Sequence, residues 1–153
     1  MRKLLLVPLF LWACGGEKAP KMDDTAMAAP AALTAADVVG SYDGTTMAEG
    51  TDSVILIWTS TTTTNAEGGL VGQLVQADAP ETPVPMTATI SGDSVTWMGG
   101  PYTPVGAAAD APQMTWTAVG RRTGDTWNGT VAFMMAGSDS VVQRATWTAT
   151  RTP

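Results

Sequence analysis

Residues 114–135 read MTWTAVGRRTGDTWNGTVAFMM, and this stretch decides the fold class. At its centre, Thr123-Gly124-Asp125-Thr126 has glycine first in a two-residue loop, which is typical of a type II′ hairpin turn. That turn places apolar residues opposite one another, in the pairs Ala118–Val131, Trp116–Phe133 and Met114–Met135. A slip of one residue would mix apolar and polar side chains on both faces, so the pattern predicts an antiparallel hairpin in this register.

Two further turns extend the same pattern. Ser91-Gly92-Asp93-Ser94 has the same form and predicts the pairs Ile90–Val95 and Ala88–Trp97. Gly137-Ser138-Asp139 is compatible with a bulged loop and predicts the pairs Met135–Val141, Val131–Ala145 and Gly129–Trp147. These pairings again bring apolar side chains together, which supports strands on both sides of each turn.

The whole domain is expected to be all-β. Thr, Val, Trp and Ile are abundant, Gly and Pro punctuate at short intervals, and no stretch has a sustained 3.6-residue apolar period. Thr34 is expected to cap one helical turn within residues 33–38. Eight strands are predicted, near residues 38–47, 53–62, 68–76, 84–91, 94–99, 113–120, 126–135 and 140–151.

Short links between consecutive strands favour an antiparallel meander. Eight meandering strands close most naturally into an up-and-down β-barrel, with the helical turn before the first strand. The alternative is a two-sheet sandwich, which usually needs a long Greek-key crossover that the sequence does not offer.

The amino terminus has the pattern of an export signal. Arg2 and Lys3 precede an apolar run over residues 4–13, which is too short for a membrane span of about 20 residues. Leu11-Trp12-Ala13-Cys14 resembles the lipobox of bacterial lipoproteins, with a bulky Trp12 where that class usually has a small residue. The alternatives are an ordinary secretory signal with a chance cysteine and a cytosolic chain with an apolar start.

The lipoprotein resemblance implies that Cys14 becomes the diacylglyceryl-modified first residue of the mature chain and anchors it in a membrane of the cell envelope. The same resemblance implies the outer membrane, because Gly15 and not Asp follows the cysteine. The chain then divides into a signal peptide (1–13), a lipidated flexible tether rich in Ala, Gly and Pro (14–32) and a β-barrel domain (33–153).

Thr34 to Tyr42 read TAADVVGSY and resemble the helical turn and Gly-x-Trp start of lipocalin-like barrels. Here Tyr42 takes the place of the Trp, in Gly40-Ser41-Tyr42. In that family an arginine from a late strand packs on the aromatic ring, a role that the resemblance implies for Arg144 or Arg151.

Composition excludes several kinds of chemistry. The formal net charge is −6, and losing Arg2 and Lys3 with residues 1–13 makes it −8, which argues against nucleic acid as a partner. The chain has no His, one Cys and no Lys within residues 33–153, which excludes His-based triads, Schiff bases and the usual zinc ligands there. A carboxylate pair is the remaining enzymatic route. We expect no enzymatic activity, cofactor or metal.

Aromatic residues at strand spacing are the remaining functional signal. Such side chains either fill a barrel as its core or line a cavity for one small molecule. The candidate lining residues are Tyr42, Trp58, Trp97, Trp116, Phe133 and Trp147. The first hypothesis is a lipid-anchored barrel that binds a small hydrophobic ligand, and the second is an interaction lipoprotein with a solid core that contacts other envelope proteins. The sequence slightly favours the first hypothesis and leaves the oligomeric state open.

Overall fold

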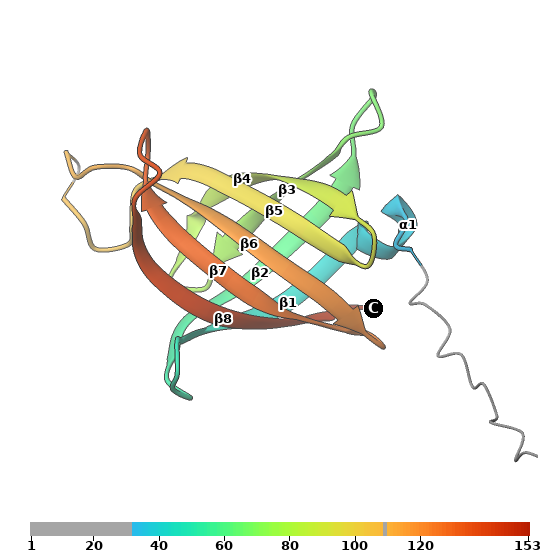
Figure 1. The fold of residues 1–153 in the computed structure, drawn as a ribbon. Helices are drawn as coiled ribbons and strands as arrows, with labels where there is room; N and C mark the ends of the chain where they lie inside the picture. The colour runs from blue at the N-terminus through green and yellow to red at the C-terminus, as the bar shows by residue number, and fades with distance from the viewer. Residues whose placement is uncertain (1–31, 109) are drawn as a thin grey trace, which may run out of the picture.

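Eight antiparallel strands form a closed barrel in the computed structural model, which describes residues 32–108 and 110–153 (Figure 1). Each strand pairs with the next, and β8 pairs with β1. This confirms the predicted barrel and its helical turn, whereas the sandwich alternative is wrong. The elements are α1 (Ala35–Val38), β1 (Gly40–Ala48), β2 (Val54–Thr64), β3 (Leu70–Gln76), β4 (Ala79–Ser91), β5 (Ser94–Tyr102), β6 (Met114–Thr123), β7 (Thr126–Met135) and β8 (Val141–Arg151).

The predicted signal peptide, Cys14 and the tether up to residue 31 lie outside the described residues. Within the described ranges, no helix has the length and hydropathy needed to cross a bilayer.

The predicted registers of the β4–β5 and β6–β7 hairpins are confirmed throughout. In the β7–β8 hairpin, the predicted pairs of Val131 with Ala145 and of Gly129 with Trp147 are also confirmed. The predicted pair of Met135 with Val141 is wrong, because Val141 lies opposite Met134. The register shifts there, so that Val142 is an extra residue on β8, as in a β-bulge.

Strand β4 begins at Ala79, five residues before the predicted start at residue 84. Its first half contains Pro80, Pro83 and Pro85. Proline lacks the backbone N–H group that a strand donates to its neighbour, so these residues argue against a strand in the sequence alone. Pairing with β5 starts only at Met86, so residues 79–85 pair with β3 alone and form a local sheet edge. Prolines are tolerated at such an edge.

The two ends of the barrel differ. Because the strands alternate in direction, α1 and the β2–β3, β4–β5 and β6–β7 links share one end, here called the closed end (Figure 1). The β1–β2, β3–β4, β5–β6 and β7–β8 links share the other, here called the open end. The long link between β5 and β6 projects from the open end in Figure 1.

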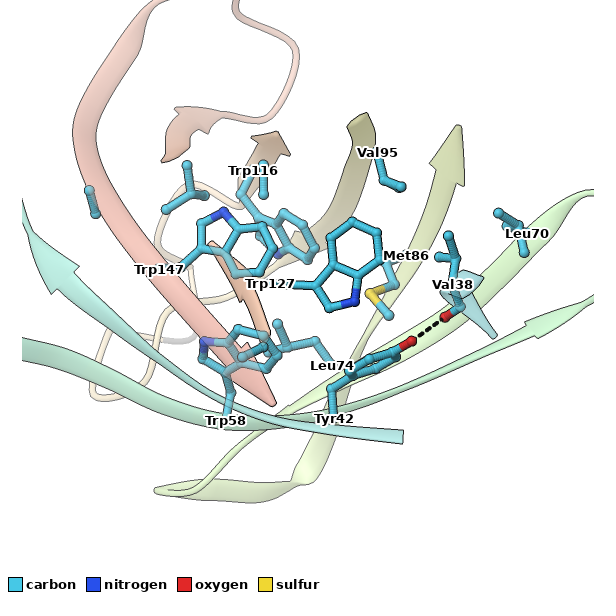
Figure 2. Packing of buried hydrophobic residues seen from close by; sticks show 14 residues of the cluster. Val38, Tyr42, Trp58, Leu70, Leu74, Met86, Val95, Trp116, Trp127 and Trp147 are labelled. Carbon is cyan, nitrogen blue, oxygen red and sulfur yellow. Dashed lines mark hydrogen bonds between the residues drawn. The ribbon is translucent and has the colours of Figure 1, made fainter. Parts of the chain in front are cut away.

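Helix α1 covers the closed end. Val38 is fully buried there in the hydrophobic core, and the Tyr42 hydroxyl donates a hydrogen bond to its carbonyl oxygen at 2.9 Å (Figure 2). The Leu33 N–H donates to the Gly92 carbonyl at 2.9 Å, which ties the segment before α1 to the β4–β5 turn. The chain therefore enters the barrel at its closed end.

An ion pair also holds α1 in place. Arg122 Nη1 lies 2.9 Å from Asp37 Oδ1, and this contact joins the helix to β6. The Thr34 hydroxyl and backbone N–H both donate to Asp37 Oδ2, at 2.7 and 2.9 Å. These two hydrogen bonds, followed by the charge of Arg122, hold the pKa of Asp37 below its ordinary value of 3.8.

Acidification is expected to weaken the closed end. The Asp37 carboxylate stabilises the fold at pH values above its unfolded pKa of 3.8, and this contribution disappears as pH falls through the lower folded pKa. The melting temperature of Asp37→Asn should therefore lie below that of the wild type at pH 6, and the difference should shrink as the pH is lowered below about 4. Thermal unfolding followed by tryptophan fluorescence measures this difference.

Glu67→Gln provides the control, because Glu67 lies at the same end and forms no ion pair within residues 32–108 and 110–153. A difference between wild type and Asp37→Asn that stays constant from pH 6 to pH 3 would contradict the assigned role of this carboxylate.

Candidate functional site

The interior of the barrel contains one continuous group of aromatic side chains. All six predicted lining residues face a common central cavity, namely Tyr42, Trp58, Trp97, Trp116, Phe133 and Trp147. Figure 2 shows the indoles of Trp58, Trp116 and Trp147 pointing inward from different strands. The structure thus places every sequence candidate on the same inner surface.

Sequence reasoning missed Trp127, which is only 2% exposed and also faces the cavity. Its position was available from the predicted register, because Trp127 shares strand parity with the inward residues Val131 and Phe133. Arg122 lies opposite Trp127 in the β6–β7 register. That arginine turns toward the closed end, where its Nε donates to the Gly124 carbonyl at 2.6 Å and its Nη1 pairs with Asp37.

Most of the other cavity residues were missed because they carry no aromatic signal, being aliphatic or polar side chains at inward strand positions. Tyr102 is aromatic and was missed because the predicted strand ended at residue 99, whereas β5 continues to Tyr102. The other cavity residues include Leu56, Leu74, Gln76, Met86, Tyr102 and Val131.

Four indoles form a connected chain across the interior. Trp97 contacts Trp127 and Trp147 edge-on, with ring centroids 5.2 and 5.4 Å apart, and Trp58 lies 6.2 Å from Trp147. Edge-to-face pairs of this kind contribute about 0.5–1.5 kcal/mol each beyond the burial of their area. The indoles therefore stabilise one another in the middle of the barrel as well as covering its wall.

Three of the tryptophans lie against strand glycines. Trp58 is paired with Gly44 and Trp116 with Gly99, and a Cβ atom at either glycine would come within 2.3 Å of the indole. Trp147 is paired with Gly129, as predicted, but its ring reaches the next strand, where a Cβ on Gly120 would lie 2.4 Å from it. The missing side chains make room for the rings.

The buried indole N–H groups of two tryptophans are satisfied inside the protein. Trp58 Nε1 donates to Thr46 Oγ1 and Trp147 Nε1 donates to the Thr130 carbonyl, both at 3.1 Å. These bonds fix the orientation of both rings, since a buried donor without a partner is costly. The cavity has three buried polar lining residues, Thr46, Ser60 and Gln76.

Tyr42 and Arg151 meet at the closed end. The Arg151 guanidinium carbon lies 6.0 Å from the centre of the Tyr42 ring, and its Nη2 donates to the Val39 carbonyl. Arg151 therefore takes the position on Tyr42 that the sequence left open between Arg144 and Arg151. Burial raises the pKa of Tyr42 above its usual value of 10.0, and the charge of Arg151 opposes this shift.

The cavity that remains between these side chains is small, with a volume of about 60 Å³. A dry cavity of about 150 Å³ is known to accept benzene, and pockets for drug-sized ligands measure about 300–1,000 Å³. The space left in the barrel is therefore of the size that holds a few water molecules. The tryptophans fill the interior more than they line it.

A second depression, with a volume of about 310 Å³, lies on the outer wall between β8, β1 and β2. It is larger than the central cavity but open to solvent. Outward threonines surround it, together with Asp43 and Ile57. A lone carboxylate in such a setting has neither a charged partner nor a second acid for proton transfer.

Within the described residues, no group of three His, Cys, Asp or Glu side chains is placed to hold a metal ion. The inward polar groups are hydroxyls and one amide, without a base beside them. This arrangement can donate and accept hydrogen bonds, and it offers no activated nucleophile.

Comparison of the sequence with models of protein families found no match, and comparisons with curated proteins and with solved structures found no similar protein.

Removing the space at a strand glycine tests the packing of the interior. In Gly120→Ala the new methyl group would collide with Trp147, and overpacking of this kind costs about 1–3 kcal/mol. We expect the free energy of unfolding to fall by that amount in urea denaturation followed by tryptophan fluorescence. Val119→Ala, on the exposed face of the same strand, is the control and should change stability by less than about 0.5 kcal/mol. Equal stability of the two variants would contradict tight packing at this position.

Proposed function

We propose that this chain is a bacterial lipoprotein of the outer membrane whose barrel is a solid, non-enzymatic module for contact with other envelope proteins. The observation that carries this proposal is the central cavity of about 60 Å³. Of the two functions that the sequence left open, only ligand binding needs an interior that is not full. The cavity volume therefore favours the second function.

The proposed anchor rests on the sequence. Cys14 is the only cysteine of the chain, so an internal disulfide is excluded, whereas its place after an apolar run suits lipid attachment. The tether from Gly15 to Ala32 has 18 residues, which as a flexible coil reach about 20–25 Å. Such a tether would hold the barrel close to the membrane surface.

Binding of a small hydrophobic ligand is the second candidate. Its support is the aromatic wall, on which Trp58, Trp97 and Trp116 face the cavity together with Phe133. A cavity that binds benzene has a volume of about 150 Å³. The central cavity is smaller, so a ligand as large as benzene would require these side chains to move.

Lipid attachment at Cys14 is tested by metabolic labelling. When the full chain is expressed in a Gram-negative host supplied with an alkyne analogue of palmitate, we expect the label in the protein and the protein in the membrane fraction. Cys14→Ser should remove the label because it removes the thiol that forms the thioether. An unlabelled wild-type chain, or equal labelling of both chains, would contradict the proposed anchor.

Native mass spectrometry tests the filled interior. The full chain is purified from the host membrane in detergent and then released from the micelle by gentle activation in the instrument. We expect the mass of the protein with its covalent lipid and nothing else, because the cavity is too small to retain a larger molecule. A further mass that leaves only at higher activation would contradict the solid core and support ligand binding.

A further inference from the structure

We propose that the open end of the barrel is a docking surface for a basic, apolar segment of another envelope protein. The inference rests on the proposed function and names the chemistry of the partner. It is carried by two features of the open end, namely uncovered apolar side chains and a surplus of carboxylates.

Among the described residues, the interior face of the barrel is more exposed at the open end than at the closed end. Met135 pairs with Met114 on the inward face beyond Phe133, yet 44% of its surface is exposed. At the closed end the corresponding inward positions are sealed, since Val38 and Val95 have no exposed surface. The inward side chains Leu56, Tyr102, Met114, Phe133 and Met135 are only partly buried or exposed, and together they are called the mouth.

Further apolar residues surround the mouth. Five exposed aliphatic side chains lie at the ends of strands or in a link at the open end, and they are called the rim, namely Val54, Ile55, Val105, Val141 and Val142. With Met135, six of the large exposed apolar side chains of the described residues lie at this end, whereas Ile57, Met98 and Val119 lie on the outer wall. A gathering of this kind is typical of a surface that another molecule covers.

Carboxylates alternate with these apolar groups. Every link at the open end carries at least one acid, and Glu81 is the third residue of β4. The set is Glu49, Asp52, Asp78, Glu81, Asp110 and Asp139. Within the described residues, the three ion pairs all lie at the closed end, where Arg121 and Arg122 meet Asp93, Asp37 and Asp125. Arg144 is the one cation in the open half of the described barrel. The open end is therefore both apolar and strongly negative.

Gln76 adds a hydrogen-bonding group to this surface. It is the last residue of β3, faces the cavity and is only 8% exposed. Its side-chain amide can donate and accept hydrogen bonds with a group that enters the mouth.

Charge selects the occupant. Two copies of this chain, mouth to mouth, would bring like charges together, and an anionic lipid surface would be repelled in the same way. The described chain begins at the closed end, where Leu33 bonds to Gly92. A protein segment with an apolar tip and flanking Lys or Arg residues can pack its tip on the mouth and the rim and pair its cations with the carboxylates.

The binding test uses the full chain in phosphatidylcholine nanodiscs and a fluorescein-labelled amphipathic peptide of Leu and Lys. Fluorescence anisotropy gives the dissociation constant. We expect binding that weakens as salt is added, and no binding of the matched peptide with Glu in place of Lys. Equal binding of the Glu peptide, or no binding of the Lys peptide, would overturn the proposal.

Paired variants locate the binding. Met135→Gln with Val141→Thr, and separately Asp52→Asn with Asp139→Asn, should each raise the dissociation constant about tenfold, as the loss of a central contact does. The matched controls are Met98→Gln with Val119→Thr on the outer wall and Asp43→Asn with Glu67→Gln away from the open end, and they should change it less than about twofold. Equal loss in variants and controls would show unspecific attraction to an acidic protein and would overturn the docking surface.

Stability and the competing occupants are measured on the same preparations. Urea denaturation midpoints within error of the wild type show that the mouth variants are folded. If the mouth variants are destabilised, the dissociation constants of the charge variants still test the docking surface. Sedimentation of the chain as a dimer that the mouth variants dissolve, or binding to phosphatidylglycerol vesicles, would assign the open end to another occupant and overturn the proposal. A small molecule retained inside the barrel would contradict the proposed function. The peptide affinity would still show whether the mouth binds a basic, apolar segment.

Discussion

The contact between indole rings and strand glycines is the constraint on which the interior of this barrel depends. Gly44, Gly99 and Gly120 leave space that Trp58, Trp116 and Trp147 occupy, so the rings pack directly against the backbone of the wall. Eight strands enclose a space that side chains can just fill. With four indoles in mutual contact, little of that space remains.

The same packing explains why the two ends differ. At the closed end, α1 adds Val38 to the core, and Arg122 and Arg151 tie the helix and its flanking residues to β6 and β8. At the open end, no corresponding element among the described residues covers Met135. Function is therefore expected at the open end and on the outer surface, because the inner volume is already occupied by the protein's own side chains.

Much of the fold could be predicted because the turns carry strong local signals. Two Gly-Asp turns set the registers of their hairpins, and strand parity then placed Trp97, Trp116 and Phe133 on the inner face. The bulge at Val142 was not predictable, since an extra residue on one strand leaves no mark in the apolar pattern. The early start of β4 was hidden by its prolines, whose tolerance depends on the absence of a β5 partner there.

The candidate site was predictable in its residues but not in its volume. Alternation along a strand shows which side chains point inward, whereas the space between them depends on ring orientations that the sequence does not state. The bond from Trp58 to Thr46 and the approach of Trp147 to Gly120 are contacts of this kind. They decide between a lined pocket and a filled core.

A crystal structure of the protein purified from its own cell envelope would show whether the interior of the barrel is full. We expect the electron density inside the barrel to be explained by the indoles and by ordered water near Gln76 and Ser60, with Trp58 and Trp147 in contact. Elongated density of a bound molecule along the barrel axis, with these indoles displaced toward the wall, would contradict a full interior.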